Sequence, residues 1–398
     1  MATNTRPAGR NTNGKGTGKK KGNSNAKIII FAIEILVIIA MIFVVWKVWD
    51  TTESSEGANI HQGYEDPNDA GINPSIQQAT NNKDNTTGNE GSGGETATPP
   101  LKIADYWNIA LFGLDATKPE HLYKGSRSDS IMIASIHKET GEIKLVSVYR
   151  DTFLNVGNDK YTKCNAAYSR GGADQAISML NMNMDLNITD FVAVGYPALI
   201  ECIDALGGVW VDIDKEELKH INNYQTSIIR DVASLANYEI VKVTETGTQL
   251  LNGLQASAYC RIRQTSGDDF KRAERQREII KAMTEKAQSA DLDTLLEVIK
   301  VVAPNVYSTF DLSDTAKMTE LLKNIGKYKI VEEGGFPTES LRTTGNIGAE
   351  GSCVIPLSLE ANVVELHRFL FGEENYEVSD EVKECSKNVA AKTAPYIN

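Results

Sequence analysis

The segment 125–151, GSRSDSIMIASIHKETGEIKLVSVYRD, constrains the fold more than any other part of the chain. Two short runs rich in Ile, Val and other apolar residues, 131–137 and 143–149, flank a turn-type segment that contains Gly141. This pattern predicts a β-hairpin. Because paired strands lie about 4.8 Å apart, such a hairpin would set the start of its first strand beside the end of its second.

Charged residues stand at the two ends that this hairpin would bring together. Arg127 and Asp129 come just before the first run, and Arg150 and Asp151 follow the second. We therefore expect these four side chains to meet at one end of a sheet. Two arginines and two acids gathered there are the groups needed to hold a phosphate-rich ligand and a divalent cation.

The N-terminal part of the chain does not have a globular composition. Residues 1–27 contain seven Lys or Arg and no acid, which predicts a disordered basic tail. The almost unbroken apolar run 28–46 would span roughly 28 Å as a helix, which predicts a transmembrane segment. No small-residue cleavage site follows a short apolar core, so an uncleaved anchor is expected. The basic flank places the N-terminus in the cytoplasm and the rest outside a cell membrane crossed once.

The rest of the chain divides into a linker and a folded part. Residues 47–100 are rich in Asn, Gly, Thr and Ser, which predicts a flexible extracellular linker. We expect a catalytic domain over 101–290, and 291–398 forms either a helical part of that domain or a small extra lobe. The expected strands are 108–113, 191–196 and 209–213, and the expected helices are 173–184, 197–206, 268–289, 292–302, 313–324 and 358–371. This alternation predicts an α/β fold, an α/β/α sandwich with a central mixed sheet.

Charge and cysteine content exclude some classes of function. The formal net charge is −12 although the first 27 residues are basic, so the external part is strongly acidic and is predicted not to bind nucleic acid. The five cysteines show no CxxC and no Cys/His spacing suited to zinc. Free buried thiols are expected, with a bridge between Cys353 and Cys385 as the alternative.

A set of arginines stands out against this acidic background. Besides the two at the hairpin, Arg261 and Arg263 are two residues apart, so on an extended chain they would point the same way. Arg272 and Gln276 share one face of the helix predicted over 268–289. One guanidinium group can donate two hydrogen bonds to phosphate oxygens, so this set of arginines predicts a pyrophosphate site. Ion pairing with surface acids is the alternative for any one of them.

Two carboxylates are candidates for a Mg²⁺ site. Asp115 follows the strand predicted over 108–113, and Asp129 lies at the same edge of the sheet. Mg²⁺ is usually held by one or two carboxylates together with phosphate oxygens of the substrate. As alternatives, Asp115 is a turn residue and Asp129 an ion-pair partner of Arg127.

As a set, these motifs resemble the LytR-CpsA-Psr family, the membrane-anchored phosphotransferases of bacterial cell envelopes. The resemblance covers roughly residues 105–285. It is carried by GLD at 113–115, RSDS at 127–130, SVYRD at 147–151, KCNAAY at 163–168 with Gly171 and Gly172, ALGGV at 205–209, LNG at 251–253, RIR at 261–263 and the segment 269–276. Tyr149 stands where the family usually has Pro, and Cys164 where an aliphatic residue is common.

The resemblance implies transfer of a glycopolymer, such as wall teichoic acid or capsule, from a polyprenyl-pyrophosphate carrier to peptidoglycan. It implies Mg²⁺ (or Mn²⁺) at Asp115 and Asp129, and an apolar channel for the lipid tail between sheet and helices. The implied pyrophosphate contacts are Arg127, Arg150, Arg261, Arg263, Arg272 and Gln276, with Lys163 nearby. Arg127, Arg150 and Asp151 are the expected catalytic residues, and the general base is either Asp151 or a metal-bound carboxylate. The alternatives are a non-catalytic module that binds polyprenyl phosphate or cell wall, and a pyrophosphatase acting on lipid-linked glycans.

Overall fold

The structure is a computed structural model that describes residues 61, 64, 68–84, 101–264, 268–290, 294, 298, 301–302, 305–309 and 329–397. Within these ranges no helix is both long and apolar enough to cross a bilayer. The predicted transmembrane helix at 28–46, the tail 1–27 and the helix predicted at 313–324 lie outside them.

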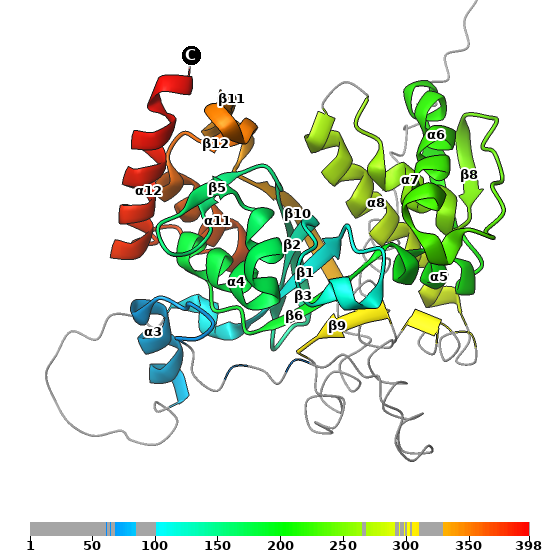
Figure 1. Cartoon of the computed structure of the whole chain (residues 1–398). Helices are drawn as coiled ribbons and strands as arrows, with labels where there is room; N and C mark the ends of the chain where they lie inside the picture. Colours follow the sequence, from blue (N-terminus) through cyan, green and yellow to red (C-terminus); the bar gives the residue numbers. More distant parts are fainter. Residues whose placement is uncertain are drawn as a thin grey trace, which may run out of the picture.

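A central mixed sheet of six strands organises the fold, as predicted (Figure 1). Its strand order is β10, β3, β2, β1, β6, β9, with the bounds β1 Tyr106–Leu114, β2 Ser128–His137, β3 Glu142–Val148, β6 Asp190–Val194, β9 Val306–Ser308 and β10 Lys329–Phe336. β1 is parallel to β6 and β10 is parallel to β3, while the other pairs are antiparallel. The predicted hairpin is confirmed, because β2 and β3 pair from Met132 with Ser147 to Ile136 with Ile143.

One face of the sheet packs against a layer of helices that Figure 1 shows on the left, formed by α4 Ala166–Met184, α11 Leu359–Phe371 and α12 Asp380–Thr393. Alternate strand residues such as Phe112 and Ile133 share a buried core with Leu366 and Val382 of these helices. This face therefore carries the main core of the molecule. Two small sheets lie nearby, β4 Phe153–Asn155 with β5 Tyr161–Lys163, and β11 Arg342–Ile347 with β12 Gly351–Pro356.

The other side of the sheet is occupied by α5 Tyr196–Ala205, α6 Lys215–Asp231, α7 Gly253–Arg261 and α8 Asp268–Ser289, on the right in Figure 1. Ile280 of α8 packs against the apolar residues of this sheet face, including Met132 and Val192. The strand predicted at 209–213 is confirmed as β7 Val209–Ile213. It pairs with β8 Gly247–Leu251 in a separate sheet and does not join the central one.

Several boundaries differ from the predictions. α4 begins at Ala166, earlier than the expected residue 173, and continues across a kink at Gly172, where φ is +71°. A Cβ at Gly172 would lie 2.4 Å from the carbonyl oxygen of Tyr123, so the kink needs glycine. α6 was not predicted, although Asp214 and Glu217 form a capping box at its start.

The prediction of a structureless linker over 47–100 is wrong for residues 68–84. α3 spans Pro74–Asp84, and Ala70 and Ile76 are fully buried in the main core. The Asn73 side chain donates to buried Asp185 and, at 3.1 Å, to Ser379 Oγ. Contacts with distant residues therefore fix a segment whose own composition is polar.

Parts of the C-terminal region pack with the central sheet. β10 forms the edge strand beside β3, and Leu359, Leu366 and Val382 lie in the main core. The described part of the region contains strands, and the helix predicted at 358–371 is confirmed as α11. All five cysteines are buried and free, so the expected thiol state is confirmed.

Within the described residues, the 3₁₀ turns are Lys102–Asp105, Pro119–Leu122, Ala233–Leu235, Glu339–Leu341, Gly348–Glu350 and Ala394–Tyr396.

Candidate functional site

Asp129 is the centre of a cluster of charged side chains at one end of the sheet. Its Oδ1 accepts a hydrogen bond from Arg150 Nη1 at 2.8 Å, and its Oδ2 accepts one from Arg272 Nη2 at 2.9 Å. Arg263 Nη2 lies 3.8 Å from the same Oδ2. These residues come from β2, the segment just after β3, the N-terminal part of α8 and the segment after α7. The meeting of Asp129 and Arg150 is the one that the hairpin predicted.

The cluster is largely shielded from water. The Asp129 side chain is 18% exposed and that of Arg272 only 4%. Burial by itself would raise the pKa of Asp129, but the guanidinium groups of Arg272 and Arg150 outweigh it and hold this pKa below its ordinary value. Asp129 is therefore ionised at neutral pH. Its single negative charge faces three guanidinium groups, so the cluster keeps positive charge that can attract an anion.

Asp151 and Lys163 extend the cluster behind Arg150. Asp151 Oδ2 lies 3.4 Å from Arg150 Nε, and its Oδ1 lies 3.2 Å from Lys163 Nζ. Lys163 is in β5, which pairs with β4, the strand that follows the loop after β3. Asp151 is buried, so its two ion pairs fix the position of Arg150 beside Asp129.

Asp115 and Arg127 lie where β1 ends and β2 begins. The register pairs Leu114 with Ser128, and Asp115 Oδ1 accepts a hydrogen bond from the backbone N–H of Arg127 at 2.7 Å. The Arg127 side chain is exposed, so this contact runs through its backbone. The predicted meeting of the Arg127 side chain with Arg150 and Asp151 is not what the structure shows.

The two candidate metal ligands are electrostatically coupled. Partial burial raises the pKa of Asp115, and the nearby charge of Asp129 adds to this rise. A divalent cation would relieve that repulsion, and carboxylate oxygens suit Mg²⁺. Among the residues that the structure describes, there is no group of three or more His, Cys, Asp or Glu that could hold a metal ion.

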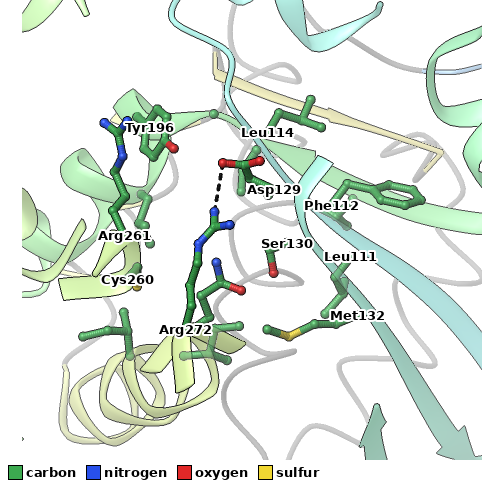
Figure 2. Close-up of a pocket in the computed structure, with 18 residues that line it drawn as sticks. Leu111, Phe112, Leu114, Asp129, Ser130, Met132, Tyr196, Cys260, Arg261 and Arg272 are labelled. Carbon is green, nitrogen blue, oxygen red and sulfur yellow. Dashed lines mark hydrogen bonds and ion pairs between the residues drawn. The ribbon is translucent and has the colours of Figure 1, made fainter. Parts of the chain in front are cut away.

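An apolar pocket of about 140 Å³ opens beside this cluster, between the sheet and α5, α7 and α8. Its walls include Leu111, Met132 and Val192 from the sheet and Leu199 and Ile279 from the helices. Asp129, Arg261, Arg272 and Gln276 also line it. Figure 2 shows the Arg272 side chain reaching to Asp129, with Arg261 and Tyr196 on one side and Leu111 and Met132 on the other. A ligand with a charged head and an apolar tail matches this lining.

Arg261 reaches the pocket by a route that differs from the prediction. The segment 258–260 was expected to lead into an extended pair, but Arg261 is the last residue of helix α7. Ile262 is fully buried, and the two arginines flank it. The Arg261 guanidinium lies 5.0 Å from the ring centroid of Tyr196, and its Nη1 is buried without a hydrogen-bond partner within the described ranges. An anionic ligand could provide that partner.

Close packing of two helices sets the position of Arg261. A Cβ at Gly253, the first residue of α7, would lie 2.2 Å from the carbonyl oxygen of Ile200 in α5. Asn252 and Gln255 form a capping box at the same helix start. Sequence reasoning missed Tyr196 and Leu199 of α5 as pocket residues. Their position directly after a buried strand was the available signal.

Comparison with known proteins agrees with this geometry. The LytR_cpsA_psr family model matches residues 71–351, well over half of the chain. Biofilm regulatory protein A of Streptococcus mutans is 26% identical over 243 residues, which are 57% of this chain and 57% of that protein. The polyisoprenyl-teichoic acid–peptidoglycan teichoic acid transferase TagU of Enterococcus faecalis is 27% identical over 233 residues, 58% of this chain and 70% of TagU.

A solved structure supports the fold independently. The crystal structure of protein gbs0355 from Streptococcus agalactiae superposes with a TM-score of 0.55 at 23% identity, covering 72% of this chain and 93% of that one. The match to the first of the two curated relatives spans little more than half of its length. From the extent of the family match and the shared fold, the chain belongs to the LytR-CpsA-Psr family.

Proposed function

We propose that this protein transfers a glycopolymer from a polyprenyl-pyrophosphate carrier to peptidoglycan, forming a phosphodiester and releasing polyprenyl phosphate. The observation that carries the proposal is the arginine cluster around Asp129 at the border of an apolar pocket. A pyrophosphate with a lipid tail has the matching two-part chemistry. The name of TagU, a teichoic acid transferase that is 27% identical, supports the same class of reaction.

The arginines would act on the charge of the pyrophosphate. Arg150, Arg263 and Arg272 already face the negative charge of Asp129, so phosphate oxygens can take up the positive charge that Asp129 does not neutralise. Guanidinium groups held in place before the reaction stabilise charge that develops on a transferring phosphoryl group. The apolar walls of the pocket would hold the lipid tail.

Asp115 and Asp129 would hold Mg²⁺ or Mn²⁺, which when bound neutralises charge on the phosphate oxygens. The proton of the attacking hydroxyl needs a carboxylate acceptor. Asp129 lines the pocket, and Asp151, which lies beside Arg150 and Lys163, does not. We propose that Asp129 accepts the proton of the hydroxyl group and that Asp151 orients Arg150.

The proposed location follows from the sequence. A single membrane helix at 28–46, with the N-terminus in the cytoplasm, would place the acidic folded part outside the cell, where peptidoglycan lies.

Transfer by the full-length protein in detergent tests the proposal. The assay contains Mg²⁺, a lipid-pyrophosphate-linked glycan and peptidoglycan oligomers, and mass spectrometry detects the phosphodiester product. Arg150→Ala should lower the rate roughly 100-fold, because it removes a donor that stabilises transition-state charge. Arg127→Ala tests the exposed arginine in the same way. Arg368→Ala is the matched control, since Arg368 is exposed and pairs only locally with Glu365.

The outcomes separate the alternatives. Undiminished transfer by Arg150→Ala would show that the site is assigned wrongly. Tight lipid binding with no product would favour a non-catalytic module. Phosphorylated glycan formed without any acceptor would favour a pyrophosphatase.

A further inference from the structure

Arg342, the first residue of β11, contacts two aromatic side chains from distant parts of the chain. Its guanidinium lies 4.8 Å from the ring centroid of Tyr149 and 4.0 Å from that of Phe270, where the electron-rich ring faces attract a cation. Its Nη1 donates to Tyr149 Oη at 3.2 Å and to the carbonyl oxygen of Pro337 at 2.9 Å. The two rings pack edge to face with centroids 4.7 Å apart. Arg342 therefore holds both rings in one group of three side chains.

The two rings belong to the segments that carry arginines of the charged cluster. Tyr149 directly precedes Arg150, and Phe270 lies two residues before Arg272 in α8. Arg150 Nη1 and Arg272 Nη2 in turn contact the two carboxylate oxygens of Asp129. The contact between the rings therefore connects the two segments whose guanidinium groups converge on one carboxylate.

Backbone hydrogen bonds fix the position from which Arg342 reaches the rings. β11 pairs with β12 along its whole length. In β12 the N–H of Val354 donates to the carbonyl oxygen of Asp151 at 2.9 Å, and the N–H of Tyr149 donates to that of Phe336 in β10 at 3.0 Å. The backbone that carries Tyr149 and Asp151 is thus bonded to β10 and β12, and Arg342 extends from the same framework of strands.

We propose that Arg342 is a positioning residue that keeps Arg150 and Arg272 at the spacing needed to bind pyrophosphate, an inference that rests on the proposed function. It acts through Tyr149 and Phe270, on opposite sides of the contact between the rings. Side chains of a working site must be held within about 0.5 Å of their productive geometry. A shift of the N-terminal part of α8 would move the Arg272 guanidinium away from that of Arg150 and weaken their joint hold on an anion.

Binding of inorganic pyrophosphate to the full-length protein in detergent, measured by calorimetry, tests this role. Phe270→Leu removes the ring that joins α8 to Arg342 and changes no charge, so it should raise the Kd about tenfold. Phe270→Tyr keeps the ring and should keep the wild-type Kd. Arg342→Met should raise the Kd by a similar factor. A Kd that rises in Arg342→Met and not in Phe270→Leu would show that Arg342 acts by its charge, which would overturn the positioning role.

A double-mutant cycle separates positioning from a general loss of stability. In the Arg150→Ala background one of the two positioned arginines is already absent, so Arg342→Met should raise the Kd by a smaller factor than in the wild type. Equal factors in the two backgrounds would show that Arg342 and Arg150 act independently, and would overturn the inference. The Phe270 pair keeps the test decisive if Arg342→Met does not fold.

Lys144→Met is the matched control. Lys144 Nζ also lies over an aromatic ring, 5.5 Å from the centroid of Phe369, and donates to the carbonyl oxygen of Phe369 at 2.6 Å. It lies in β3, six residues before Arg150. Lys144→Met should lower stability in urea unfolding and leave the Kd for pyrophosphate unchanged. A rise in Kd as large as that of Arg342→Met would reduce the effect of Arg342 to general destabilisation and overturn the inference.

The transfer assay distinguishes failure of this inference from failure of the proposed function. Arg342→Met should lower kcat about tenfold and leave the KM for peptidoglycan oligomers unchanged, because Arg150 and Arg272 act on the phosphate charge. If the wild type transfers glycan and the Arg342 and Phe270 variants bind pyrophosphate as it does, the inference fails and the proposed function stands. If the wild type transfers nothing while these variants lose pyrophosphate binding, the proposed function fails and the positioning role is supported.

Discussion

Replacing Asp129 by Asn tests the charge cluster most directly. The change removes the negative charge that Arg150 and Arg272 contact at 2.8 and 2.9 Å. Because the Arg272 side chain is only 4% exposed, its charge can gain little from water. Removing one partner of a buried ion pair costs roughly 3–5 kcal/mol. Asp129 is 18% exposed and Asn keeps one acceptor oxygen, so we expect the lower end of that range, about 3 kcal/mol.

Thermal unfolding with and without inorganic pyrophosphate measures this effect. A loss of about 3 kcal/mol lowers the Tm of a domain of this size by roughly 5 °C. Inorganic pyrophosphate supplies the missing negative charge, so it should restore most of the loss and stabilise the variant more than the wild type. Asp380→Asn is the control, since Asp380 is 95% exposed and should change the Tm far less.

The pH dependence gives a second readout of the same variant. The pKa of Asp129 in the folded protein is lowered, so the stability that its charge contributes is present above the unfolded pKa of about 3.9. That contribution is lost as the pH falls through the folded value. The difference in Tm between wild type and Asp129→Asn should therefore be full at pH 7 and shrink in acid. Equal stability at pH 7, or no stabilisation of the variant by pyrophosphate, would refute the reasoning.

Three further changes test other parts of the structure. Asp115→Asn should raise the Tm of the metal-free protein at pH 7, since the pKa of Asp115 is raised in the folded protein and its charge is therefore unfavourable there. This gain in Tm should disappear below about pH 4. Calorimetry should also show weaker Mg²⁺ binding by the variant. Gly253→Ala should cost about 1–3 kcal/mol in urea unfolding, because its Cβ would lie 2.2 Å from the Ile200 carbonyl oxygen. Asn73→Ala should cost about 1–3 kcal/mol in the same assay, because it removes a donor to buried Asp185; no loss would place residues 68–84 outside the cooperative fold.

The hairpin, and the contact between Asp129 and Arg150 that it produces, could be predicted because the sequence pattern is local. Apolar runs on both sides of a glycine-containing turn fix which strand ends meet, and this brought Asp129 and Arg150 together in advance. The contact between Asp129 and Arg272 spans more than a hundred residues. The helix that carries Arg272 was predictable, but the sheet edge on which it packs was not, since no local pattern encodes that packing.

The wrong predictions of an extended segment at Arg261 and of a linker over residues 68–84 have the same physical origin. The apolar residues before Arg261 are too few to distinguish a strand from a buried helix by periodicity, although the capping pair Asn252 and Gln255 pointed to a helix. Residues 68–84 are polar in composition, and only a few apolar side chains such as Ala70 and Ile76 fix them to the core. Short helices are marginal alone, so tertiary contacts decided both segments.

Tyr149, which stands where the family usually has Pro, contacts the C-terminal region, for which the sequence predicted no role. Its backbone N–H donates to the carbonyl oxygen of Phe336 at 3.0 Å, a bond that a proline at this position could not form. Its ring needs the space left by Gly335, and its hydroxyl accepts from Arg342. All three partners lie in the C-terminal third of the chain. Tyr149 therefore connects the C-terminal region to the charged cluster, because Tyr149 directly precedes Arg150, which contacts Asp129.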